Sequence, residues 1–129
     1  MYRTTIFFCS LIVSGLAFGD WKKITTGFRS TAYADIESIR KSGDITAMNV
    51  LIDFEKAPFD GNNLPYLSLK MAAEYNCRER QFRAIEVVSH EGRMATGNTP
   101  YTSEQPGNWE SIPDKSLQKA LWETACGKQ

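Results

Sequence analysis

The fold is decided by the stretch LSLKMAAEYNC, which runs from Leu67 to Cys77. Every second side chain of the stretch is apolar, and the side chains between them are polar except Ala72. Successive side chains of a β-strand point to opposite faces, whereas a helix with about 3.6 residues per turn would scatter the apolar groups around its surface. The stretch therefore predicts a half-buried strand. Its apolar face consists of Leu67, Leu69, Met71, Ala73, Tyr75 and Cys77.

Residues 1–19 have the pattern of a secretory signal peptide. Arg3 precedes an apolar run at positions 6–16, and Ala17-Phe18-Gly19 places small residues where a signal peptidase recognises them. Cleavage is expected before Asp20. A membrane anchor is the alternative, but this run is shorter than the roughly 20 residues that a bilayer requires. No cysteine stands at the cleavage position, so no lipid anchor is expected.

Residues 20–129 suffice for one domain with one core. The whole chain has 15 basic and 15 acidic residues, so removal of Arg3 leaves a formal net charge of −1. A nearly neutral chain does not attract nucleic acid or an anionic membrane. We expect neither as a partner, and no membrane span after signal cleavage.

Two cysteines, Cys77 and Cys126, remain after Cys9 leaves with the signal peptide. An exported chain enters an oxidising compartment, where two thiols with one possible pairing form a disulfide. This bridge would close a loop of about 49 residues. The chain-entropy model gives such a loop about 4 kcal/mol of stabilisation. Because Cys126 ends a helical pattern, we expect a C-terminal helix tied across the buried face of a sheet.

Local patterns predict the other elements. In Arg80–Glu91 the alternation is broken, which indicates either a bulge or a strand covered on both faces. Trp21 is expected to fill the core rather than to form a binding platform. The last helix begins at Asp114 or Ser116 and stops at Gly127. The remaining expected elements are strands at Trp21–Thr26, Thr31–Ala34, Ile45–Glu55 and Arg93–Thr96, a helical turn at Asp35–Arg40, and a loop at Lys56–Tyr66.

Catalytic chemistry finds little support in the sequence. The single histidine, His90, stands between Ser89 and Glu91. Adjacent residues of a strand point to opposite faces, so these three do not form a catalytic triad. One histidine and scattered carboxylates are also a poor metal site. We therefore expect no enzyme, no metal and no cofactor; an enzyme would need a cleft that gathers Asp35, His90 and a loop carboxylate.

Two groups of side chains are candidates for contact with a protein partner. Arg78, Arg80 and Arg83 could form a basic patch, although nearby glutamates favour a mixed, solvated surface. Tyr66 and Tyr101 stand in predicted loops, where an aromatic side chain is suited to partner contact.

The order of short motifs resembles the surface-adhesin protein E family of bacterial envelope proteins. A tryptophan opens the domain, and the last motif is followed by Cys126. The motifs between them are Tyr33-Ala34-Asp35, Ser38-Ile39-Arg40, Gly43, Glu74-Tyr75-Asn76-Cys77-Arg78, Arg80, Arg83, Met94, Gly97 and Trp109-Glu110-Ser111-Ile112-Pro113. The resemblance spans nearly all of residues 20–129.

This resemblance implies an α+β fold, in which a single antiparallel sheet carries the C-terminal helix on its concave face, linked by Cys77–Cys126. It also implies a non-enzymatic role, since the named adhesin is a surface lipoprotein that binds host matrix and serum proteins and can form dimers. Because no lipid-anchor cysteine stands at the cleavage position, we expect a periplasmic or secreted protein.

The first functional hypothesis is therefore an adhesin-like module that binds a protein, including host matrix proteins, through loops and a sheet edge. A homodimer is compatible with it. The alternative is a periplasmic carrier that holds a small ligand in an apolar gap between sheet and helix, suggested by the many large apolar side chains.

Overall fold

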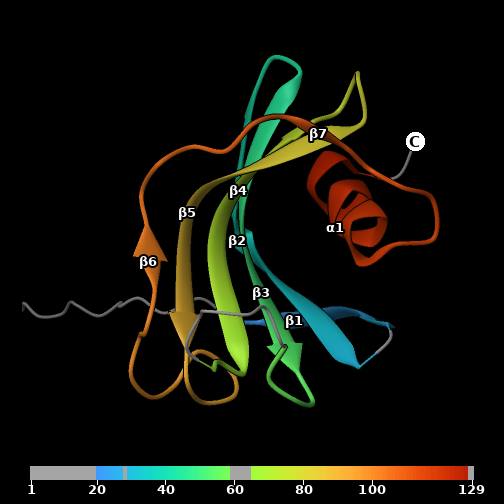
Figure 1. The fold of residues 1–129 in the computed structure, drawn as a ribbon. Helices are drawn as coiled ribbons and strands as arrows, with labels where there is room; N and C mark the ends of the chain where they lie inside the picture. Colours follow the sequence, from blue (N-terminus) through green and yellow to red (C-terminus); the bar gives the residue numbers. More distant parts are fainter. Residues whose placement is uncertain (1–19, 28, 59–64, 128–129) are drawn as a thin grey trace, which may run out of the picture.

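The structure, a computed structural model, describes residues 20–27, 29–58 and 65–127. These residues form an antiparallel sheet with a helix on its concave face (Figure 1), which confirms the predicted α+β fold. The sheet order is β1-β2-β3-β4-β5-β6, with β7 also paired to β5. The elements are β1 (Lys22–Gly27), β2 (Ser30–Ser42), β3 (Ile45–Phe54), β4 (Ser68–Asn76), β5 (Gln81–His90), β6 (Thr102–Ser103), β7 (Glu110–Ser111) and α1 (Leu117–Cys126). The predicted signal peptide lies outside the described residues.

The predicted central strand is β4, and its alternation sorts the two faces of the sheet as expected. Ala73 and Tyr75 are buried on the face toward α1, and Leu69 and Met71 pack against the same core. The neighbouring β3 continues this apolar surface with its own alternating side chains, Met48, Val50 and Ile52.

The expected short strand Thr31–Ala34 lies within the long strand β2, which also takes the place of the expected helical turn. Strand β2 pairs with β3 on both sides of a register shift between Asp35 and Arg40. At this irregularity the Ser38 hydroxyl donates to the Asp35 carbonyl oxygen (2.6 Å) and accepts from the Asn49 amide (2.8 Å). The helical turn at Asp35–Arg40 was therefore a wrong prediction, because side-chain hydrogen bonds allow the extended chain to continue through the irregular segment.

Strand β5 contains the bulge that was one of the two explanations for its broken alternation. Ala72 pairs with Glu86 and Ala73 pairs with Ala84, so Ile85 is the extra residue. The extra residue shifts the pairing by one position. Ala84 therefore lies on the face toward α1 with Ala73, and Glu86 lies on the opposite face with Ala72.

Ser116, one of the two predicted starts, is the N-cap of helix α1. The Ser116 hydroxyl accepts a hydrogen bond from the Lys119 amide at 3.1 Å, as an N-cap residue does. Leu121 and Ala125 are buried against the sheet, and Ile112 joins the same cluster from the segment that precedes the helix. The helix thus closes the core formed by β2, β3 and β4.

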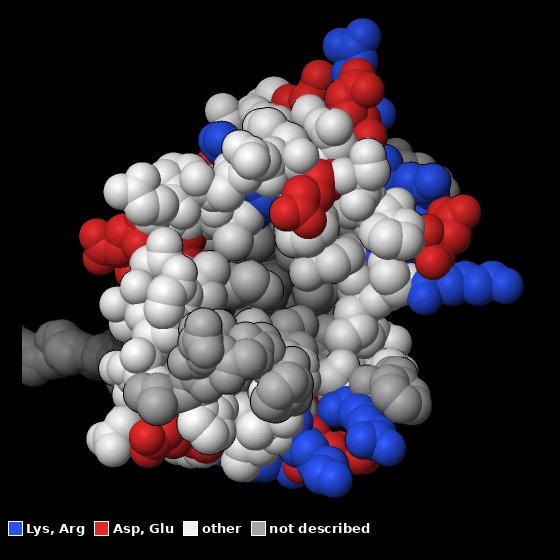
Figure 2. All heavy atoms as spheres, viewed as in Figure 1, with Lys and Arg blue, Asp and Glu red and all other residues white. Residues whose placement is uncertain are grey.

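Charged side chains are distributed around the molecule without a continuous patch of one sign in the view of Figure 2, where Lys and Arg alternate with Asp and Glu. This mixture agrees with the nearly balanced composition. Within the described residues, no helix has the length and apolar character needed to cross a membrane.

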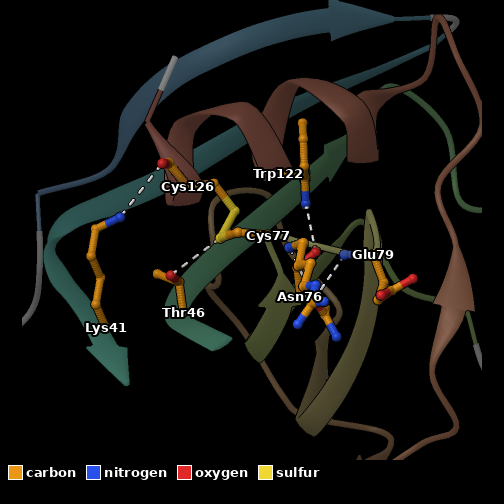
Figure 3. Close-up of a disulfide and its surroundings, with 8 residues drawn as sticks. Lys41, Thr46, Asn76, Cys77, Glu79, Trp122 and Cys126 are labelled. Atoms are coloured by element: carbon orange, nitrogen blue, oxygen red, sulfur yellow. Dashed lines mark hydrogen bonds between the residues drawn. A yellow bond between two sulfur atoms is a disulfide. The ribbon is translucent and has the colours of Figure 1, made fainter. Parts of the chain in front are cut away.

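A disulfide joins Cys77, at the end of β4, to Cys126, at the end of α1, with a Cα–Cα distance of 5.6 Å. Figure 3 shows the polar contacts around it. The Trp122 indole Nε1 donates to the Asn76 carbonyl oxygen at 2.9 Å, and Lys41 Nζ donates to the Cys126 carbonyl oxygen at 3.5 Å. The predicted bridge is confirmed, and these hydrogen bonds fix the helix at the same end of the sheet.

Replacing either cysteine should lower the free energy of unfolding by about 4 kcal/mol, because the unfolded chain regains the freedom of a 49-residue loop. We expect Cys77→Ser, Cys126→Ser and the double variant to lose similar amounts in urea unfolding, since all three remove one shared bond. Midpoints equal to that of the unreduced parent would show that the bond contributes nothing.

Candidate functional site

The face of the sheet turned away from α1, called here the outer face, carries a hollow of about 510 Å³. Cross-strand pairing places Asp35 opposite Asn49, Asn49 opposite Ala72, and Ala72 opposite Glu86. These four side chains form one row across β2–β5. The hollow is lined by Trp21, Asp35, Asn49, Lys70, Met71, Ala72, Glu86, Val88, Met94 and Ala95.

Trp21 is half-buried and lines this hollow, so its predicted place in the core was wrong. Lys22 pairs with Ala34, a residue of the buried face. Side chains alternate along both strands, so the residue before Lys22 falls beside Asp35 on the outer face. An aromatic ring therefore stands at the β1 end of the row.

Three charged residues of the hollow have no ion-pair partner among the described residues. They are Asp35, Lys70 and Glu86, and none of them lies within 4.0 Å of an opposite charge. The Asp35 carboxylate accepts a hydrogen bond from the Glu37 amide at 3.2 Å. The hollow therefore combines apolar walls with charges that remain available to a partner.

One wall of the hollow comes from the turn after β5, called here the Met94 loop (residues 92–97). The Asp53 carboxylate, only 3% exposed, holds this loop to the sheet. It accepts hydrogen bonds from Arg93 Nε (2.8 Å), Arg93 Nη2 (2.6 Å) and the Met94 amide (2.8 Å). Because these bonds fix a tight turn, the predicted strand at Arg93–Thr96 was wrong.

Ser68 provides the second attachment of the Met94 loop. Its fully buried hydroxyl donates to the Gly92 carbonyl oxygen (2.7 Å) and accepts from the Ala95 amide (2.9 Å). Met94 and Ala95 both have positive φ angles, 53° and 61°. This conformation costs about 1–2 kcal/mol for each residue that is not glycine. Buried hydrogen bonds therefore hold the loop in a shape that its own residues disfavour.

Arg78, Arg80 and Arg83 do not form a common basic patch. Each arginine lies next to a carboxylate: Arg78 next to Asp44 (3.7 Å), Arg80 next to Asp114 (3.2 Å), and Arg83 next to Glu74 (2.9 Å). The Arg83 guanidinium also lies over the Trp109 ring, 4.7 Å from its centroid. The structure therefore places these residues in separate ion pairs, and their part in partner binding stays a prediction.

The two candidate tyrosines differ in exposure. Tyr101 is 56% exposed, and its carbonyl oxygen accepts from the Ser89 amide at 2.9 Å, so the side chain stands on a fixed backbone. Tyr66 is half-buried and packs edge-to-face on Phe54, with 5.8 Å between ring centroids. Tyr101 is therefore the more accessible of the two.

The structure does not bring Asp35 and His90, the residues named for a catalytic cleft, together in the hollow. The His90 side chain is buried, and neither ring nitrogen makes a hydrogen bond of good geometry. Asp35 lies in the hollow, whereas His90 does not line it. Within the described part of the chain, no three His, Cys, Asp or Glu side chains cluster in a way that could hold a metal ion.

Comparison with known proteins gives the family. Residues 21–127 match the family model described as Surface-adhesin protein E. The chain belongs to this family. The match covers nearly the whole described domain, so the resemblance seen in the motifs is confirmed. No curated protein sequence matches the chain.

Solved structures of Haemophilus influenzae protein E share the family fold. Crystal form II of that protein aligns with a TM-score of 0.62 at 11% identity, covering 90% of this chain and 94% of that chain. Protein E from non-typeable Haemophilus influenzae aligns with a TM-score of 0.54 at 14% identity, covering 85% and 78%. At such low identity the likeness establishes the surface-adhesin fold alone.

The hollow and its loop were missed in the sequence, although one signal was present. Asp53 interrupts an apolar run between Ile52 and Phe54. A carboxylate in a buried strand requires partners, so it points to a specific polar contact. The partner, Arg93, is 40 residues away, and no local pattern connects the two positions.

Asp53→Asn should release the Met94 loop, because the amide cannot replace both charge-assisted bonds to Arg93. We expect a loss of about 2 kcal/mol in urea unfolding, with faster hydrogen exchange at the Met94 amide. The matched control is Asp44→Asn in an exposed ion pair, which should cost less than about 1 kcal/mol. Equal, small losses for both variants would contradict the role given to Asp53.

Acidification should destabilise the fold through His90. Burial lowers the pKa of His90, the nearby Lys70 charge acts in the same direction, and the Gly97 backbone offsets part of this effect. The unfolded chain therefore binds the proton more readily, and stability is lost as the pH falls below about 6.5, the ordinary histidine value.

Urea midpoints measured between pH 7.5 and 5.5 test this expectation. His90→Gln should show a shallower decline over this range than the parent. Identical pH dependence in the two proteins would assign the loss to other groups.

Proposed function

We propose that this chain is an exported, non-enzymatic envelope protein that binds another protein through the outer face of its sheet. The observation that carries the proposal is membership of a surface-adhesin family combined with the hollow, whose tryptophan wall and unpaired charges suit recognition of a protein surface. Host matrix proteins are the partners that the family suggests.

Loops and the sheet edge extend this proposed surface. Strand β1 pairs only with β2 in the described sheet, so one side of its backbone is available for an added strand. Exposed Tyr101 and the arginines Arg78, Arg80 and Arg83 are further candidate contacts. A homodimer through the β1 edge is one form that strand addition could take.

The carrier remains the second candidate, because a hollow of about 510 Å³ has the size of a small-molecule site. The space between sheet and helix contains Met48, Tyr75 and Leu121, all at most 1% exposed. The outer face is therefore the better place for a small ligand. Native mass spectrometry of freshly purified protein should then detect a bound molecule.

Binding of the purified chain to immobilised basement-membrane extract tests the adhesin proposal. We expect saturable binding that Trp21→Ala and Tyr101→Ala each weaken several-fold. Glu123→Ala is the matched control, because Glu123 belongs to α1 on the opposite face, and it should bind like the parent.

Two results would contradict the proposal. The first is an absence of binding by folded parent protein. The second is a loss of binding in Glu123→Ala while Trp21→Ala and Tyr101→Ala bind normally.

A further inference from the structure

We propose that the outer-face hollow receives a basic side chain and an apolar one two residues away from it on an extended segment of the protein partner, where alternate side chains share a face. This inference rests on the proposed function and adds the chemistry of the recognised segment. It arises from three features of the hollow: apolar walls, an excess of unpaired carboxylates, and a rigid loop.

The apolar walls favour an aliphatic side chain. Trp21, Val88 and Met94 line the hollow together with the small side chains of Ala72 and Ala95. Ala72 in the row leaves space on β4, while the tryptophan and methionine supply large contact surfaces. A methionine side chain adapts to the shape of an apolar partner.

The charges favour a basic side chain two positions away from the apolar one. Asp35 and Glu86 contribute two carboxylates to the lining, against the single ammonium of Lys70. None of the three is neutralised by an ion pair in the described chain. A lysine or arginine of the partner would therefore meet a net negative charge, and the Trp21 ring could add a cation–π contact.

The Met94 loop makes the hollow rigid before a partner arrives. Asp53 and Ser68 hold the Met94 and Ala95 amides in a left-handed conformation that these residues disfavour. A Cβ atom on Gly92 would collide with the Thr96 hydroxyl, so the start of the loop is also tightly packed. A preformed wall avoids the entropy cost of ordering a loop on binding.

Two short peptides test the recognised chemistry. The ¹⁵N-labelled chain is titrated with acetyl-Leu-Ala-Arg-Ala-Leu-amide and with acetyl-Leu-Ala-Glu-Ala-Leu-amide, and the indole N–H signals of Trp21, Trp109 and Trp122 are followed by NMR. We expect the arginine peptide to shift the Trp21 signal saturably and the glutamate peptide to bind at least fivefold more weakly. Equal effects of the two peptides, or an unmoved Trp21 signal, would overturn the proposal.

Variants separate the contributions of the charges and of the apolar wall. Asp35→Asn combined with Glu86→Gln should weaken the arginine peptide roughly fivefold, and Met94→Ala should weaken both peptides. Glu79→Gln, in the exposed turn after β4, is the matched control and should change nothing. Urea midpoints confirm that each variant is folded before its affinity is compared.

The outcome is distinguishable from failure of the proposed function. Binding to matrix extract without selective peptide binding would overturn this inference and leave the adhesin proposal standing. Selective peptide binding without any matrix binding would support the chemistry of the hollow and contradict the adhesin proposal.

Discussion

The covalent bond between Cys77 and Cys126 holds the last helix of the chain on the concave face of the sheet. A domain of this size has a small core, and much of that core lies between β3, β4 and the helix. The bond restricts the unfolded chain, and the Trp122 and Lys41 hydrogen bonds support the helix at the same end. Because the core lies between the sheet and α1, the side chains of the opposite face need not be apolar.

The outer face differs from the face toward α1 in carrying charged side chains and a hollow. Its row of Asp35, Asn49, Ala72 and Glu86 lies where β2 and β5 depart from regular pairing. Bulges often occur near functional sites, because they redirect side chains without ending a sheet. Buried Asp53 and Ser68 then attach the Met94 loop beside the row. The outer face thus carries charged and buried polar groups, whereas the face toward α1 is apolar.

Much of the fold could be predicted because its determinants are local. Alternation along β3 and β4, the serine cap of α1 and the pairing of two cysteines are each visible within a few residues or follow from a count. The helical turn predicted at Asp35–Arg40 failed because an Asp-Ile-Glu-Ser sequence satisfies both a helix cap and an irregular strand. Only pairing with Asn49 on β3 distinguishes the two.

The candidate site was harder to predict because its parts are distant in sequence. Trp21 was assigned to the core, since a large aromatic residue in a strand is usually buried, and its face depends on the pairing of β1 with β2. The attachment of Arg93 to Asp53 likewise requires the folded sheet. Sequence motifs gave the family, whereas the geometry of the outer face came from the structure.

The central claim is that the disulfide-linked helix α1 closes one face of the sheet and that the other face binds a partner. Hydrogen–deuterium exchange of the chain with and without basement-membrane extract tests it most directly. The account predicts new protection in the Met94 loop and around Trp21, with α1 unchanged. Protection confined to α1 would contradict it.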